Sequence, residues 1–407
     1  MSHSKPVYAS VPSDMLEIDV PLELLDRCLS ISSHSGTSAS VSKVSARLVD
    51  KVRAAQRPLL IVDALCYPFD FLQEAGELAK IMPTAAFTAG KGVVDETNPN
   101  WHGALSGPID YRPDVVLMLG PLLSDTNTAA WTAVPEGDSV VKFNLDDVEI
   151  DDEVHHVHGK AVLQSLVSAL HPELTTATGP AKGIELLPQN GQKGKASKGE
   201  SSSISQDSFW ATMSPFLRPN DTDILANGTP LLGGRSMQLP AQTQVVASSV
   251  WCSIGQMLPA AHGIALAKRD HDIPGRTILL EGDGSFQVTC QALSDIIRYK
   301  LDVTIFILNN GGYTYERWLN GIEAEYNDVP SWRYSNAPSF FGAEGRATGY
   351  PIMSVRVEKW SELEEVLADA KLHDGKGLKL VDVVMEAADV PEKSKAGLRR
   401  GSEALRV

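Results

Sequence analysis

The sequence predicts an α/β protein with two doubly wound parallel-sheet domains that a flexible linker joins. Residues 41–171 alternate helix-like segments with short apolar, strand-like runs, and residues 208–388 repeat this alternation. Such an order is typical of parallel sheets covered by helices. Between the two regions, residues 172–207 are rich in Gly, Ser, Lys and Pro, which is typical of a mobile linker. A chain of 407 residues is also too long for one ordinary hydrophobic core.

The first region, residues 36–171, is expected to form a Rossmann-like middle domain. Two of its stretches have the apolar spacing of amphipathic helices, and four short aliphatic runs have the character of buried strands. No GxGxxG motif follows its first strand, so the alternation does not by itself imply a bound nucleotide. The expected helices are 41–55 and 71–82, and the expected strands are 58–64, 84–89, 114–120 and 140–145.

The second region, residues 208–390, is expected to form another α/β domain, with a surface helix or disorder in the tail at 391–407. In the linker, Lys193, Lys195 and Lys198 are interpreted as solvated residues, with a basic docking patch as the alternative. The expected elements of the second region are a crossover helix at 287–299 and strands at 222–227, 277–282, 303–309 and 378–385.

The composition excludes several classes of protein. The formal net charge of −15 argues against nucleic acid as the main partner, because phosphate binding needs a basic face. No apolar run approaches the roughly 20 residues that span a bilayer, and the N-terminus lacks the pattern of a signal peptide. The cysteines, Cys28, Cys66, Cys252 and Cys290, form no CxxC pair, so neither a disulfide framework nor a structural zinc site is predicted. We therefore expect a reduced, cytoplasmic protein.

Oxygen-bearing side chains stand at the ends of two successive expected strands. Asp283 lies in a Gly-Asp-Gly turn directly after the run 277–282, and Asn310 follows the run 303–309. Ligands of open parallel sheets bind at the carboxyl ends of strands, and a right-handed crossover keeps successive strands close. The two side chains can therefore converge on one Mg²⁺, which prefers oxygen ligands and accompanies diphosphates. An Asp-Gly turn without any ligand is the alternative, but GDGS, a helix, an apolar strand and NN together are much more specific.

At this motif the sequence resembles the thiamine-diphosphate-dependent decarboxylases, the family of the pyruvate and indolepyruvate decarboxylases. GDG followed, after a helix and a strand, by NN is the signature of thiamine-diphosphate enzymes. The resemblance extends over nearly the whole chain. The stretches that carry it are KPVYASVPSDMLEIDVP, TAGKGVVDETNPNWHGALSG, LLSDTNTAAW, NGTPLLG, VWCSIGQ and NNGGYTYERWLNGIEAEYNDVPSW.

The resemblance implies two cofactors, thiamine diphosphate and Mg²⁺, and a role for each matched residue. Asp283 and Asn310, together with the Gly312 carbonyl, would bind the metal. Glu316 would be the catalytic glutamate that assists proton transfer, with an ordinary glutamate at a helix start as the alternative. The residues that would contact the cofactor are Thr229 beside the aminopyrimidine, Cys252, Ser253 and Ile254 along the thiamine, with Ile254 as the wedge that bends it, and Gly284, Ser285, Asn310, Gly311, Gly312, Tyr313, Thr314 and Tyr315 around the diphosphate.

The sequence also departs from the family pattern. Cys252 stands where these decarboxylases usually have glycine, so its side chain would crowd the aminopyrimidine, and Asn227 and Pro230 also replace typical residues. Residues 1–35 resemble the last strand and exit of the family's N-terminal pyrimidine-binding domain, of which about 150 residues would be missing. In the family that domain supplies a glutamate for the aminopyrimidine, and an aspartate and a His-His pair for substrate protons.

These features predict a lyase that decarboxylates a 2-oxo acid, pyruvate or an indolepyruvate-like one, to an aldehyde and CO₂ without oxidation. The chain alone is expected to be inactive, because the N-terminal catalytic domain would be missing. The alternative is a non-catalytic cofactor-binding or regulatory subunit that oligomerises with full-length relatives. The expected partners are a small-molecule 2-oxo acid and other subunits, in a homo-oligomer or a mixed oligomer, since an uncovered apolar face would favour self-association. Three clustered histidines, His155, His156 and His158, are interpreted as a solvated edge, with a metal site or a proton relay as alternatives.

Overall fold

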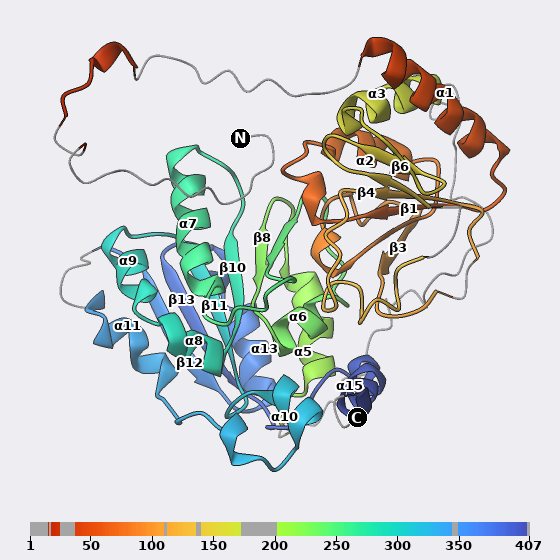
Figure 1. Ribbon diagram of the computed structural model, residues 1–407. Helices are drawn as coiled ribbons and strands as arrows, with labels where there is room; N and C mark the ends of the chain where they lie inside the picture. Colours follow the sequence, from red (N-terminus) through yellow and green to blue (C-terminus); the bar gives the residue numbers. More distant parts are fainter. Residues whose placement is uncertain are drawn as a thin grey trace.

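Two mostly parallel β-sheets with helices packed on them form the architecture, which confirms the predicted α/β class (Figure 1). The division of the chain at the predicted domain boundaries stays a prediction. The computed structural model describes residue 15 and residues 18–24, 37–109, 112–135, 140–171, 202–343 and 349–404.

The first sheet has seven strands in the order β3-β2-β1-β4-β5-β6-β7. The first five strands of the chain pair in parallel, and the last two add an antiparallel edge. The four strands predicted from aliphatic runs are present, and β3, β6 and β7 are additional. The strands are β1 (Pro58–Val62), β2 (Thr84–Ala86), β3 (Trp101–Ala104), β4 (Val115–Leu119), β5 (Val140–Phe143), β6 (Val148–Ile150) and β7 (Glu153–His155).

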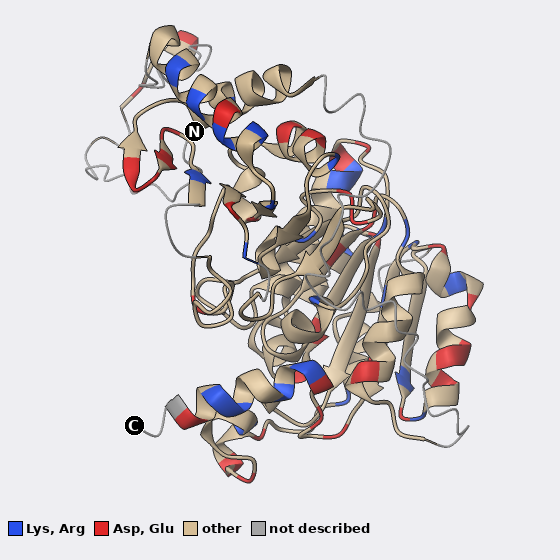
Figure 2. Ribbon diagram, turned by 90° about the vertical axis from the view of Figure 1, so that its right-hand side faces the viewer, with Lys and Arg blue, Asp and Glu red and all other residues tan. Residues whose placement is uncertain are grey.

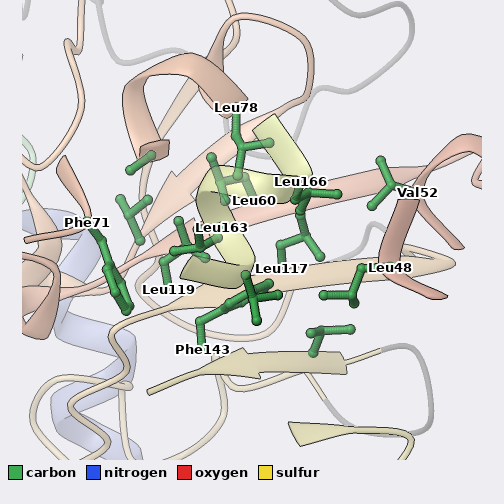
Figure 3. Packing of buried hydrophobic residues seen from close by; sticks show 14 of the residues in the cluster. Leu48, Val52, Leu60, Phe71, Leu78, Leu117, Leu119, Phe143, Leu163 and Leu166 are labelled. Atoms are coloured by element: carbon green, nitrogen blue, oxygen red, sulfur yellow. The ribbon is translucent and has the colours of Figure 1, made fainter. Parts of the chain in front are cut away.

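Three helices cover one face of this sheet: α1 (Ser38–Ala54), α2 (Leu72–Ala79) and α3 (Gly159–Ala169). Alternate residues of each strand point to this face, so their side chains meet the apolar stripes of the helices. The short segments η3 (Ala64–Cys66) and η4 (Thr88–Gly90) follow the ends of β1 and β2. Figure 3 shows this core, which includes Leu60, Leu117, Leu119 and Phe143 of the sheet and Leu48, Leu163 and Leu166 of the helices, all fully buried.

The second sheet has six parallel strands in the order β12-β13-β11-β10-β8-β9. The four predicted strands are β8, β10, β11 and β13, and they occupy the centre of the sheet, where continuous apolar runs are expected. β9 and β12, at the two edges, are additional. The strands are β8 (Thr222–Leu225), β9 (Gln244–Ala247), β10 (Thr277–Gly282), β11 (Val303–Asn309), β12 (Ile352–Val357) and β13 (Leu378–Val384).

Helices lie on both faces of the second sheet, as a doubly wound sheet requires (Figure 1). One face is covered by α7 (Met257–Asp270), α8 (Asp283–Thr289) and α9 (Ala292–Arg298), and the other by α5 (Gln206–Phe216), α6 (Thr229–Gly234) and α13 (Trp360–Ala368). The other helices of the described ranges are η2 (Leu22–Leu24), α10 (Thr314–Asn320), η5 (Glu325–Asn327), η6 (Tyr334–Asn336), α11 (Ala337–Phe340), α14 (Ala370–His373) and α15 (Glu392–Ala404).

Some predicted boundaries differ from the structure. The single crossover helix expected at 287–299 is wrong: α8 begins at Asp283 itself, and a break at 290–291 separates it from α9. The Thr289 hydroxyl donates to the Gly255 carbonyl at 2.7 Å, so the end of α8 is tied to a neighbouring turn. The end of the predicted linker is also structured, since α5 begins at Gln206. Most of that linker, including Lys193, Lys195 and Lys198, lies outside the described residues.

Charged side chains of both signs alternate on the outer helices (Figure 2). On the first sheet, Arg47 and Lys51 of α1 form ion pairs with Asp151 at 2.8 and 2.5 Å, and Arg47 also pairs with Glu153. The acidic edge of the sheet is therefore neutralised locally. Within the described ranges, no helix has the length and apolar character needed to cross a bilayer.

Candidate active site

Asp283 and the loop after β11 are brought together at the carboxyl ends of two neighbouring strands. β10 and β11 pair directly, with Gly282 opposite Leu308. One carboxylate oxygen of Asp283 accepts hydrogen bonds from the backbone N–H groups of Gly311 at 2.7 Å and Gly312 at 3.1 Å. The other oxygen accepts from Gly284 N–H at 2.7 Å. The predicted convergence of the two strand ends is therefore present in the structure.

Two oxygen atoms at this point suit a hard cation. The Asn310 side-chain oxygen is buried and has no hydrogen-bond partner, although buried amide oxygens are normally satisfied. Asp283 is 1% exposed, and burial raises the pKa of its carboxyl to about 6 against the opposing effect of the backbone N–H groups. A carboxylate and an unsatisfied amide oxygen are ligands that Mg²⁺ takes. The residues present therefore fit the metal that the sequence predicts.

The backbone of the loop after β11 is held in an unusual conformation. Gly311 and Gly312 have φ angles of +74° and +145°, which disfavour L-residues. Arg317 of α10 fixes the loop, because its guanidinium donates to the Gly311 carbonyl at 3.2 Å and pairs with Asp328 at 2.5 Å. The Tyr313 N–H donates to the Asn327 carbonyl at 2.8 Å. These contacts hold Gly312, whose carbonyl is the predicted third metal ligand and whose N–H donates to Asp283, in its place in the loop.

A cavity of about 150 Å³ adjoins this point. It gathers the predicted site residues from four separate segments of the second sheet's unit, and Ser253 and Gly311 are the two that are not part of its lining. No added Cβ atom at Gly282 would meet another atom within 4 Å, so the backbone there faces open space. The lining residues are Thr88, Thr126, Asn227, Gly228, Thr229, Leu231, Leu232, Arg235, Cys252, Ile254, Gly282, Asp283, Gly284, Ser285, Asn310, Gly312, Tyr313, Thr314, Tyr315 and Glu316.

The turn at 252–255 forms another part of the wall. Cys252 has a φ of +47°, a left-handed conformation that glycine adopts at lower cost. This agrees with the expectation that the family which the sequence resembles has glycine at this position. Burial raises the pKa of the Cys252 thiol. The Gly255 N–H donates to the Ser285 hydroxyl at 2.8 Å, which links this turn to α8. Ile254, the predicted wedge, is 42% exposed at the cavity.

Glu316 lies in the first turn of α10, at the exposed side of the cavity. Its carboxylate accepts a hydrogen bond from the Asn320 side-chain amide at 2.7 Å. Together with Asp283 it is one of two carboxylates among the described lining residues, and no histidine is among them. Its catalytic role stays a prediction.

Eight lining residues are not among the predicted site residues. Thr88 and Thr126 come from the first sheet's unit, within two of the stretches that carry the family resemblance. Thr126 and Ser124 both donate to the Ser249 carbonyl, so this unit is held against the turn that precedes Cys252. Four more, Asn227, Gly228, Leu231 and Leu232, lie in the NGTPLLG stretch, and Gly282 begins the Gly-Asp-Gly turn. The last, Arg235, directly follows α6, and no motif in the sequence marks it.

The three histidines lie elsewhere. His155 ends β7 at the edge of the first sheet, where Glu153 approaches its ring at 3.5 Å. None of the three lines the cavity, and in the part of the chain that the structure describes no group of three or more His, Cys, Asp or Glu side chains could hold a metal ion. The geometry favours the solvated edge over the proton relay.

Comparison with known proteins relates both regions to one family. Residues 45–170 match the central domain of thiamine pyrophosphate enzymes, and residues 230–383 match their C-terminal TPP-binding domain. Among curated proteins, a pyruvate decarboxylase of Aspergillus parasiticus is 34% identical over 96% of this chain and 69% of its own length. Pyruvate decarboxylase isozyme 1 of Saccharomyces cerevisiae is 29% identical over 95% and 69%.

Solved structures support the fold. Benzoylformate decarboxylase from Polynucleobacter necessarius superposes with a TM-score of 0.66 at 17% identity, and the match covers 94% of this chain and 69% of that one. A thiamin diphosphate-dependent enzyme from Mycobacterium smegmatis gives a TM-score of 0.65 at 19% identity, over 90% and 67%. Two mostly parallel sheets in series are thus the shared architecture.

Proposed function

Since the chain belongs to the thiamine pyrophosphate enzymes, on the branch of the pyruvate decarboxylases, we propose that it is an Mg²⁺-dependent decarboxylase of a 2-oxo acid. The product is an aldehyde, with CO₂ released and no oxidant consumed. One observation supports this most: a cavity at the ends of β10 and β11 gathers almost every residue that the family resemblance singles out.

The residues of the cavity would divide the binding of the cofactor between them. Asp283, Asn310 and the Gly312 carbonyl would hold Mg²⁺, and Gly284 and Ser285 would contact the diphosphate. When bound, thiamine diphosphate supplies the carbon nucleophile and the electron sink for decarboxylation. The protein must then exclude water, hold the cofactor bent and move protons. Leu231, Leu232 and Ile254 form an apolar part of the cavity wall. The other lining residues that would approach the thiamine are Thr229, Cys252, Thr88 and Thr126.

Glu316 is the proposed proton-transferring group. Its carboxylate lies at the open side of the cavity and is oriented by Asn320, so it can exchange protons with solvent and with a reacting carbon inside. A glutamine at this position would keep the size and the hydrogen bond but could not transfer a proton. Glu316→Gln should therefore lower turnover by roughly 10²–10⁴-fold while cofactor binding is retained.

Aldehyde release from pyruvate and indolepyruvate by the purified chain, with thiamine diphosphate and Mg²⁺, tests the function. Calorimetric titration with the cofactor tests the site separately. Asp283→Ala should weaken cofactor binding by roughly 100-fold, whereas Asp270→Ala, at the exposed end of α7, should change nothing. Unaltered binding in Asp283→Ala would refute the metal site.

A second candidate follows from the composition of the cavity wall. Among its described residues are two carboxylates, one of them a proposed metal ligand, and no histidine. The remaining proton-handling groups would then come from outside the described residues, either from this chain or from a partner. A non-catalytic cofactor-binding or regulatory subunit of a mixed oligomer fits this composition. Cofactor binding without aldehyde formation, and turnover restored by a full-length relative, would favour it.

Oligomer formation, as a homo-oligomer or with a relative, is part of the proposal. Trp251 is 85% exposed, and Val250 and Ile254 beside it are 36% and 42% exposed. Gly255 of the same turn packs near Val288, another exposed apolar residue, so these side chains form one patch next to the cavity. Sedimentation of Trp251→Ser as a smaller species than the unaltered chain would support this interface. The cytoplasmic location stays a prediction.

A further inference from the structure

Arg235 places a positive charge in the wall of the cavity. It directly follows the last helical residue of α6, so the helix that begins at Thr229 carries it to the same cavity. Among the described lining residues it is the one basic side chain. Tyr315 is the neighbour that favours its charged form, and no carboxylate of the described chain is paired with its guanidinium.

An arginine in this position needs an anion. The side chain is partly buried in the cavity wall, and a guanidinium that gives up water contacts without gaining a partner loses stabilisation. Arginine also offers a planar fork of donors that matches a carboxylate. A ligand that enters the cavity with a negative group at Arg235 would supply the missing partner.

The position of Arg235 separates this anion from the diphosphate. The Tyr315 hydroxyl lies within electrostatic reach of Cys252, Glu316 and Arg235, which therefore cluster around one side chain. The groups that would hold the diphosphate are around Asp283, whose carboxylate accepts hydrogen bonds from the backbone of Gly284 and of the loop after β11. Arg235 and the proposed proton-transferring residue, Glu316, thus share Tyr315 as a neighbour in the cavity wall, and this part of the wall is the one assigned to the substrate here.

The carboxylate that leaves as CO₂ is a poor partner for this arginine. Its charge moves into the carbon skeleton during decarboxylation, so an ion pair would stabilise the substrate more than the transition state. A second carboxylate, remote from the reacting carbon, keeps its charge throughout and can be held without this disadvantage. On the proposed function, we propose that the substrate is a 2-oxo dicarboxylic acid whose distal carboxylate binds Arg235.

The reaction balances without a further reagent. The bond between C1 and C2 of the diacid breaks, C1 leaves as CO₂, and the electron pair stays on C2, which takes up one proton. The product is an aldehyde that keeps the distal carboxylate. Leu231 and Leu232, on the same helix as Thr229, provide apolar surface for the methylene groups.

A matched pair of substrates tests the proposal: 2-oxoglutarate, and 2-oxopentanoate, which has the same chain length and no distal charge. With saturating thiamine diphosphate and Mg²⁺, the unaltered full chain should use 2-oxoglutarate with the higher kcat/KM. Arg235→Met should lower kcat/KM for the diacid roughly 30-fold or more and leave kcat/KM for the monoacid within about threefold of its value in the unaltered chain. Arg235→Lys, which keeps the charge but loses the fork, should give an intermediate loss. Arg298→Met, at the exposed end of α9, is the control and should change neither.

A binding measurement keeps the two proposals distinguishable. Glutarate and pentanoate, which cannot be decarboxylated by this reaction, are titrated into the cofactor-loaded chain. Glutarate should bind more tightly than pentanoate, and Arg235→Met should abolish this difference in affinity. If this holds while no 2-oxo acid gives an aldehyde, the proposed function is wrong and the anion site stands. If monoacid and diacid are used and bound equally, or if Arg235→Met weakens thiamine diphosphate instead, the diacid proposal is wrong and decarboxylation stands.

Discussion

Asp223 is an isolated carboxyl group in the second sheet. It lies within β8, is fully buried, and neither of its side-chain oxygens has a hydrogen-bond partner. Burial raises the pKa of its carboxyl to about 8, and the nearby charges of Asp221 and Glu96 add to the effect while Lys91 opposes it. The folded protein therefore keeps this group neutral at pH values where an unfolded chain ionises it.

This raised pKa predicts a loss of stability as the pH rises. Between the ordinary pKa of an aspartate, about 4, and about 8, the folded state binds a proton that the unfolded state has lost. The stabilisation is complete below this window and is lost as the pH passes through it. Asp223→Asn, which stays neutral, should gain about 1.4 kcal/mol per pH unit over the unaltered protein in this window. Urea unfolding at pH 5.5, 6.5 and 7.5 measures the difference, and a constant difference between the two proteins would contradict the assignment.

Single residues of the site differ in how far the sequence reveals them. Asp283 and Asn310 were predictable because strands end at fixed carboxyl edges, and a turn motif marks both ends. Arg235 was not, since a lone arginine after a helix has no periodic or motif signal, and its significance comes from the partner it lacks. Cys252 stood out in the sequence, but the backbone strain that it accepts is visible in its φ angle alone.

At the scale of whole elements, apolar runs predicted the strands that are buried on both faces. β10 and β11 are examples, because in a covered parallel sheet nearly every position is apolar. The antiparallel strands β6 and β7 escaped prediction, since they are short and their pairing is fixed by neighbours. The break between α8 and α9 also depends on a tertiary contact, the bond from Thr289 to Gly255, which local spacing cannot show.

The loop between β11 and α10 offers a matched pair of glycines. A Cβ atom at Gly312 would lie 2.0 Å from the Asn327 carbonyl oxygen, whereas one at Gly311 would meet nothing within 4 Å. Both have positive φ angles, so both variants carry backbone strain. Gly311→Ala should destabilise by about 1 kcal/mol, and Gly312→Ala by about 3 kcal/mol because the backbone must move as well.

Thermal unfolding and cofactor titration measure this comparison. Gly312→Ala should also weaken thiamine diphosphate binding in the presence of Mg²⁺, because it displaces a carbonyl that is a proposed metal ligand. Gly311→Ala, with its Cβ in open space, is the matched variant that carries backbone strain without the contact with Asn327. Equal losses in the two variants would show that the contact with Asn327 does not hold the loop.

At the scale of the whole molecule, a buried ion pair joins the two sheets' units. Lys91 and Glu96 of the first unit are each 1% exposed in their side chains and pair at 2.8 Å. Lys91 also donates to the Met237 carbonyl at 2.9 Å, and Glu96 accepts from the Leu239 N–H at 3.2 Å. Both partners in the second unit follow α6, the helix that carries Thr229 and Arg235. The pair therefore couples the packing of the two units to the position of one cavity wall.

Removing one member of this pair should uncouple the unfolding of the two units. Lys91→Met leaves the Glu96 carboxylate buried and unpaired, which should cost about 3–5 kcal/mol, and the Met237 carbonyl also loses its donor. We expect calorimetry to show the single unfolding transition splitting into two, as the units lose their coupling. Lys91→Met with Glu96→Gln removes the buried charge and keeps an acceptor for Leu239, so it should recover at least half of the loss. A double variant no more stable than Lys91→Met would show that the lysine acts through its contact with Met237 rather than through the ion pair.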